Sequence, residues 1–168
     1  MISWSSYKSD IKSLISNMTS KDEAAFAKSF TNITTTKVLA NAADDYGNKL
    51  IPNNLDAMEI AIRLGALKSK STGNSSNFIK SVSTGLMIIM NSSTLEFDNT
   101  PPSTVGVSNI INFPGISINI ELKNYDNPDI FCNIMEIILK SFLANVKGIL
   151  TYTTQSGATV PQSWSGLK

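Results

Sequence analysis

The chain has 168 residues, 42% of them hydrophobic and only 16% charged, with a formal net charge of +1. It contains no histidine, which removes the commonest general base and most transition-metal sites, so we expect neither an enzyme nor a cofactor or metal site. Arg63 is the only arginine, and because phosphate and base recognition rely on arginine's bidentate fork, we expect no direct recognition of nucleic acid.

The sequence also indicates the compartment in which the chain is made. Its first residues lack the charged leader and apolar run of a signal peptide, and no apolar stretch is as long as a membrane span. Cys132 is the only cysteine, so no disulfide can form within the chain, and it is predicted to be a small core residue. These features predict a soluble chain made in a reducing cytoplasm.

Helical spacing dominates the first third of the sequence. Apolar residues three and four apart predict an amphipathic helix over about 4–18. Ser20 and Glu23 form a capping box that predicts the start of a second helix. The threonines within 32–36 are poor helix formers and predict a break, after which a third helix is expected over 38–46.

Two further helices are expected before residue 92. The first is capped by Asn53 or Asn54 and presents apolar side chains at Met58, Ile60, Ala61 and Leu64. It should fray into the Ser/Gly-rich run 69–76, which is predicted to be an exposed loop. The second covers about 78–91 and contains Gly85, which weakens a helix unless another backbone packs closely there.

The segment 127–147 is predicted to be the central helix. Asn127 can cap it and Pro128 suits the first helical position. Its apolar side chains fall in two adjacent i, i+4 rows, which make a face far wider than a surface helix needs, so we expect it to be covered on most sides. Those rows are Ile130, Ile134, Ile138, Phe142 and Val146, and Phe131, Met135, Leu139 and Leu143.

Strand patterns appear only in the second half. Alternating apolar residues predict a strand at 116–122, and β-branched and aromatic residues predict another at 149–154, which could pair with it. The Pro-containing segment 98–115 is predicted to be an extended loop or arm, and 155–168 a Pro/Ser/Gly-rich tail.

The expected fold is therefore mainly α (α+β) and forms a single domain over 1–168. It is a bundle of about five to six helices around the buried helix 127–147, with a small antiparallel strand pair (116–122 and 149–154) and extended arms.

Candidate functional residues are few. The acidic pair Asp44–Asp45 is predicted to be solvated surface, because neighbouring helix positions point in different directions. Trp164 lies in the tail, and its indole should bury either against its own core or in a neighbouring copy or partner. With the apolar residues of the two extended segments it gives a candidate subunit interface of Val105, Val107, Phe113, Val160 and Trp164.

Several short motifs follow one another along nearly the whole chain: Tyr46-Gly47-Asn48, Thr100-Pro101-Pro102, Phe113-Pro114-Gly115, Gly148 to Tyr152, and Trp164-Ser165-Gly166. Their order resembles that of small virion proteins of tailed bacteriophages, of the tail-completion or neck (head-to-tail connection) type. In such proteins the helix before the glycine often carries a histidine, which this chain lacks. The resemblance implies a non-enzymatic component made in the host cytoplasm and incorporated in the virion. It would form a homo-oligomeric ring at the head–tail junction or tail end, with its own copies and neighbouring virion proteins as partners.

An alternative interpretation is a monomeric helical module that binds an apolar ligand, with Met58, Met87, Met90 and Met135 as adaptable lining. The ring interpretation predicts that a chain lacking 157–168 folds as a monomer and fails to assemble. The ligand interpretation predicts thermal stabilisation by a lipid or aromatic compound.

Overall fold

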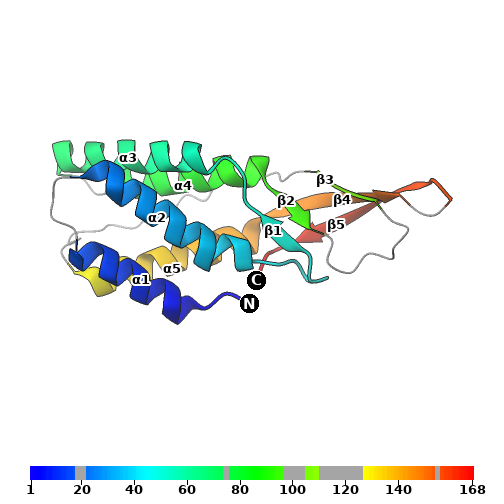
Figure 1. The fold of residues 1–168 in the computed structure, drawn as a ribbon, viewed down its shortest axis with the longest axis horizontal. Coiled ribbons are helices and arrows are strands. Elements are labelled where there is room, and N and C mark those ends of the chain that lie inside the picture. Colours follow the sequence, from blue (N-terminus) through cyan, green and yellow to red (C-terminus); the bar gives the residue numbers. More distant parts are fainter. Residues whose placement is uncertain (18–21, 74–75, 97–104, 110–126, 154–155) are drawn as a thin grey trace.

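In the computed structural model, a body of helices lies at one end of an elongated molecule and a narrow antiparallel sheet projects from it (Figure 1). The structure describes residues 1–17, 22–73, 76–96, 105–109, 127–153 and 156–168.

The described residues form five α-helices, one short 3-10 helix and five strands. The helices are α1 (Trp4–Asn17), α2 (Glu23–Lys37), η1 (Leu39–Asn41), α3 (Leu55–Thr72), α4 (Ser76–Ser92) and α5 (Pro128–Asn145). The strands are β1 (Lys49–Ile51), β2 (Thr94–Glu96), β3 (Val105–Asn109), β4 (Lys147–Thr153) and β5 (Thr159–Ser165). This confirms the mainly α, α+β fold class and the number of helices.

Helix α5 confirms the predicted central helix. The Asn127 side chain accepts hydrogen bonds from the backbone N–H groups of Asp129 (3.0 Å) and Ile130 (3.4 Å), and Pro128 opens the first turn. Both features satisfy or remove donors that a helix start leaves unpaired. Eight side chains of this helix are buried: Phe131, Cys132, Ile134, Met135, Ile138, Leu139, Phe142 and Leu143.

Helix α2 differs from the prediction at both ends. Asp22 caps it, accepting from the N–H groups of Ala24 (3.1 Å) and Ala25 (3.0 Å), whereas the predicted cap Ser20 lies outside the described residues. The predicted break at 32–36 is absent because the helix continues to Lys37. The side chains of Thr31, Thr34 and Thr35 are buried there, so burial of this face overrides the low helix propensity of threonine.

The predicted third helix over 38–46 is also wrong. Only η1 is helical, and Ala42 is already extended. The backbone instead pairs with the β1 segment: Leu50 donates to the Ala42 carbonyl (2.8 Å), and Ala43 and Lys49 form an antiparallel bridge. These pairings replace the hydrogen bonds that a helix would have made.

Helices α3 and α4 form an antiparallel hairpin whose close contact depends on two glycines. A Cβ at Gly85 would lie 2.9 Å from Cγ of Met58, and a Cβ at Gly65 would collide with the Ser81 side chain. This close approach explains Gly85 within a helix. Helix α3 runs to Thr72, past the predicted fraying point at residue 69, and Gly73 ends it in the left-handed conformation.

The helices share one hydrophobic core, in which aromatic side chains join three of them. Phe30 of α2 lies edge-on to Phe78 of α4, with ring centroids 5.6 Å apart, and Phe78 lies 5.7 Å from Phe131 of α5. Such aromatic pairs are stabilising beyond their area of burial.

The strand pairing corrects the predicted two-stranded unit. Strand β4 confirms the strand at 149–154, but its antiparallel neighbours are β3 on one edge and β5 on the other. Both edges of β4 are occupied from Ile149 to Thr153 by these two strands, and the predicted partner 116–122 lies outside the described residues. The predicted arm 98–115 therefore contains a sheet strand, β3, and the predicted tail 155–168 contains β5.

Candidate assembly surface

The three-stranded sheet carries four of the five predicted interface residues. Val105 and Val107 lie in β3, opposite Thr153 and Thr151 of β4. Val160 and Trp164 lie in β5, and Phe113 lies outside the described residues. The sheet thus brings the two predicted extended segments together on either side of β4, which sequence reasoning did not anticipate.

Strand β5 has one covered face and one exposed face. Its side chains alternate regularly: Thr159, Pro161, Ser163 and Ser165 are exposed, whereas Val160 and Gln162 are half-buried and Trp164 is buried. This period of two is typical of a strand with one face packed on its own chain. The exposed face is polar and uncharged, and Pro161 removes one backbone donor from the strand.

Trp164 attaches strand β5 to the hydrophobic core of its own chain. It is 6% exposed and belongs to the main hydrophobic core. In the pairing of β4 with β5 it lies opposite Gly148, where a Cβ would come within 2.7 Å of the indole ring. The glycine therefore makes room for the tryptophan, and the indole is covered by its own chain, which is one of the two alternatives that the sequence left open.

The residues after β5 are also fixed to the body. The N–H of Leu167 donates to the Leu143 carbonyl (2.9 Å), and the Leu167 side chain is buried. Ala43 and Lys168 exchange two backbone hydrogen bonds, of 2.9 and 2.8 Å. The segment predicted to be a tail is thus part of the folded body.

Asp44 corrects the prediction of a solvated acidic pair. Its carboxylate is buried and accepts hydrogen bonds from the N–H groups of Tyr46 (2.9 Å) and Asn48 (2.8 Å) and from the Asn48 side-chain amide (2.8 Å). Gly47, with φ of 87°, completes the turn. Asp45, by contrast, is exposed and pairs with Lys168. Asp44 therefore shapes the Tyr46-Gly47-Asn48 turn, and sequence reasoning missed it because it assumed a helix here.

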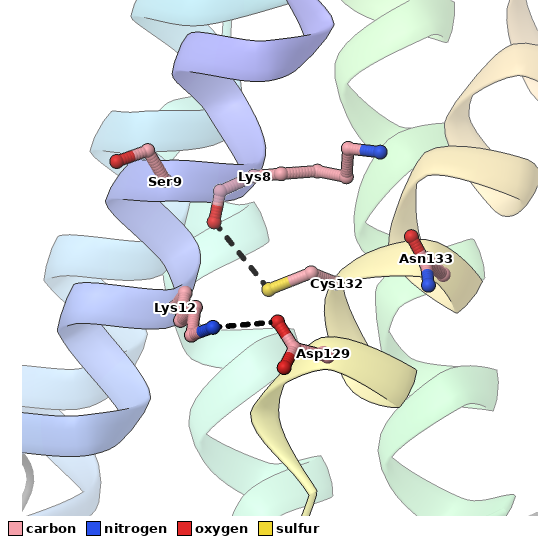
Figure 2. A pocket seen from close by; sticks show the side chains of 6 residues that line it. All are labelled: Lys8, Ser9, Lys12, Asp129, Cys132 and Asn133. Atoms are coloured by element: carbon pink, nitrogen blue, oxygen red, sulfur yellow. Dashed lines mark hydrogen bonds and ion pairs between the residues drawn. The ribbon is translucent and has the colours of Figure 1, made fainter.

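A small pocket of about 150 Å³ lies between α1 and α5 (Figure 2). Its lining is polar: Lys8, Ser9, Lys12, Asp129, Cys132 and Asn133. Lys12 forms an ion pair of 2.7 Å with Asp129, and the Cys132 thiol donates to the Lys8 carbonyl oxygen (3.4 Å). Burial raises the pKa of the Cys132 thiol, which disfavours the reactive thiolate. The structure thus confirms Cys132 as a buried core residue, 3% exposed.

The methionines considered as ligand lining are mostly core residues. Met58, Met90 and Met135 are fully buried, whereas Met87 is on the surface. None of them lines the pocket between α1 and α5. Three of the four methionines thus fill the core in the described part of the chain.

The described ranges contain no cluster of three or more Cys, Asp or Glu side chains placed to hold a metal ion. Within the same ranges, none of the helices combines the length and apolarity needed to cross a membrane.

One exposed apolar surface was missed by sequence reasoning. The sequence predicted a helix bearing Met58, Ile60, Ala61 and Leu64 without assigning its buried face, and the buried residues of α3 are Met58, Ile62 and Gly65. Ile60 and Leu64 are 60% and 61% exposed, and Leu67, one turn further, is 41% exposed. Because α3 is apolar on two sides, its sequence alone did not show which side faces the core.

Comparisons with known proteins identify no relative. No family model matches the chain, and no similar protein was found among curated sequences or solved structures. The function is therefore inferred from the residues and geometry described above.

Proposed function

We propose that this chain is a structural virion protein of a tailed bacteriophage, of the tail-completion or neck type, whose identical copies assemble into a ring. The observation that carries the proposal is the β3–β4–β5 sheet, which projects from the helical body along the long axis of the molecule (Figure 1). A projecting sheet with edge strands offers backbone and side-chain groups to neighbouring copies without unfolding the body.

The resemblance adds support because two of its motifs meet in this sheet. Gly148 opens the motif in β4, and Trp164 opens the motif at the end of β5. The two residues pair directly, with the indole over the glycine. Their shared role is to attach the sheet to the body, so that its exposed face is held in one orientation.

The proposal is tested by the solution mass of the purified chain, measured by light scattering at several concentrations, with electron microscopy of any assembly. Closed rings of one size are expected. A chain that remains monomeric at every concentration would contradict self-assembly into a ring.

A matched pair of variants locates the contact. Thr159→Lys/Ser163→Lys adds two charges to the exposed face of β5 and should abolish the rings while leaving the melting temperature unchanged. The control, Ser5→Lys/Ser9→Lys, makes the same change at exposed positions of α1. Equal loss of rings in both variants would argue against the sheet as the contact.

A further inference from the structure

Helix α3 presents an apolar stripe to solvent. Ile60, Leu64 and Leu67 follow one another at i, i+4 and i+7, so they share one side of the helix. Helix α3 lies at the edge of the body, above α2 and away from α1 (Figure 1). Met87 of the adjoining α4 is also partly exposed. Three large side chains in one row are more apolar surface than scattered surface residues would provide.

Charged residues flank this stripe without ion pairs in the described part of the chain. Elsewhere in the body, lysines pair across helices: Lys8 with Glu136 (2.8 Å), Lys12 with Asp129 (2.7 Å), Lys37 with Asp10 (3.2 Å) and Lys70 with Glu23 (2.6 Å). Asp56 and Arg63 of α3 are both exposed, and neither forms an ion pair with a described residue. The pKa of Glu23 is lowered chiefly by its hydrogen bond with Lys70, and Arg63 adds only a weaker, longer-range attraction.

The two charges are arranged so that they complement a second copy of the same helix. Seven residues separate them, about 10.5 Å along the axis at 1.5 Å per residue, so they share one flank of the stripe but lie too far apart to pair with each other. A twofold axis crossing α3 between Ile60 and Leu64 reverses the second helix. With the axis level with residue 62, Asp56 of each copy lies five residues, about 7.5 Å along the helix axis, from the level of Arg63 of the other, an offset that the long arginine side chain spans.

We infer that α3 is a self-association surface on which a second copy of this chain docks antiparallel, α3 against α3, with Ile60 and Leu64 at the centre and two symmetry-related Asp56–Arg63 ion pairs along one flank. Such a contact is isologous, since the same patch serves both copies. It buries the apolar row and neutralises its flanking charges at once. The contact goes beyond the proposed function, because it would join two copies whether or not the sheet forms a ring.

The inference is tested by charge exchange in the full-length protein, with the dimer dissociation constant measured by sedimentation at several concentrations. Asp56→Arg and Arg63→Asp each place like charges together twice, and each should weaken the dimer at least tenfold. The double variant Asp56→Arg/Arg63→Asp restores opposite charges at both sites, and should return the constant to within about threefold of the parent chain. Leu64→Ser should abolish the dimer.

All three positions are exposed, so the variants should retain the parent's circular dichroism and melting temperature. Lys28→Glu, an exposed charge reversal on α2, is the matched control and should leave the dimer unchanged. A parent chain with no dimeric contact, or a dimer that survives Leu64→Ser, would overturn the inference. Failure of the double variant to restore the dimer would equally overturn the antiparallel arrangement. Rings that persist in the Leu64→Ser variant after the α3 contact is lost would support two independent contacts and leave the proposed function standing.

Discussion

Replacing Trp164 by alanine tests whether β5 is anchored within its own chain. A buried tryptophan removes about 150–250 Å² from water, which corresponds to about 4–6 kcal/mol at 25 cal/mol per Å². Residual compactness of the unfolded chain lowers this value by roughly 10–40%. The indole N–H of Trp164 has no hydrogen-bond partner among the described residues, so its removal recovers part of about 1–3 kcal/mol of desolvation cost. We expect a net loss of about 3 kcal/mol in the free energy of unfolding, at the lower end of measured Trp→Ala losses.

The assay is urea unfolding followed by far-UV circular dichroism. At a slope of about 2 kcal/mol per M, a loss of about 3 kcal/mol moves the midpoint by roughly 1.5 M to lower urea. Trp4→Ala is the control: Trp4 is only partly buried and interacts with the Lys140 ammonium 5.1 Å from its ring centre, so its loss should be smaller.

Gly148→Ala should also destabilise the protein, by about 1–3 kcal/mol, because the added Cβ would overlap the Trp164 ring. A Trp164→Ala chain that unfolds at the parent's midpoint but no longer assembles would refute this reasoning. It would show that the indole acts in a neighbouring copy after all.

Three further predictions concern other parts of the body. Asp44→Ala should cost about 2–4 kcal/mol, because it leaves buried donors of the turn unpaired. Tyr7→Phe should be neutral or slightly stabilising at pH 7, since no described residue meets the buried hydroxyl in good hydrogen-bond geometry, and the nearby Thr34 side chain only partly offsets the effect of burial on its pKa. Burial raises the pKa of Tyr7 above its unfolded value, because it disfavours the charged phenolate. The stability linked to this group is therefore present below about pH 10 and falls above it, by at most about 1.4 kcal/mol per pH unit. The Tyr7→Phe variant should not show this decline. Deleting 157–168 should unfold the chain, because it removes β5 and the buried Leu167 together.

Each of these predictions has a matched comparison. Asp45→Ala changes the exposed neighbour of Asp44 and should cost less than about 1 kcal/mol; equal losses in both variants would contradict the role assigned to the turn. For Tyr7, urea midpoints of parent and variant are compared from pH 7 to 11, and parallel curves would contradict a raised pKa. For the deletion, circular dichroism and light scattering distinguish an unfolded chain from the folded monomer that the sequence led us to expect.

Local interactions explain what the sequence could predict. Asn127 and Pro128 define the start of α5 through bonds within one turn, and its apolar rows require burial on most sides whatever the neighbours are. Helices α1 and α4 were predicted for the same reason, since their inner residues repeat with helical spacing. A condition stated for Gly85, that another backbone must approach it, is satisfied by Met58.

Only the tertiary structure decided the remaining features, because each depends on a partner distant in sequence. The threonines of α2 stay helical because their face is buried, and 38–46 leaves the helix because β1 and the Asp44 carboxylate offer other hydrogen-bond partners. Strand β4 takes β3 and β5 as neighbours, a choice that alternation within one strand cannot specify.

The same reason separates the candidate site residues. The sequence determined that the Trp164 indole must be buried against something. Only the structure shows that it is buried in its own chain, because Gly148 on the adjacent strand leaves room for the ring. The sequence likewise determined that the helix α3 carries apolar side chains at Met58, Ile60, Ala61 and Leu64. Only its packing on α2 and α4 decided that Ile60 and Leu64 are the side left exposed.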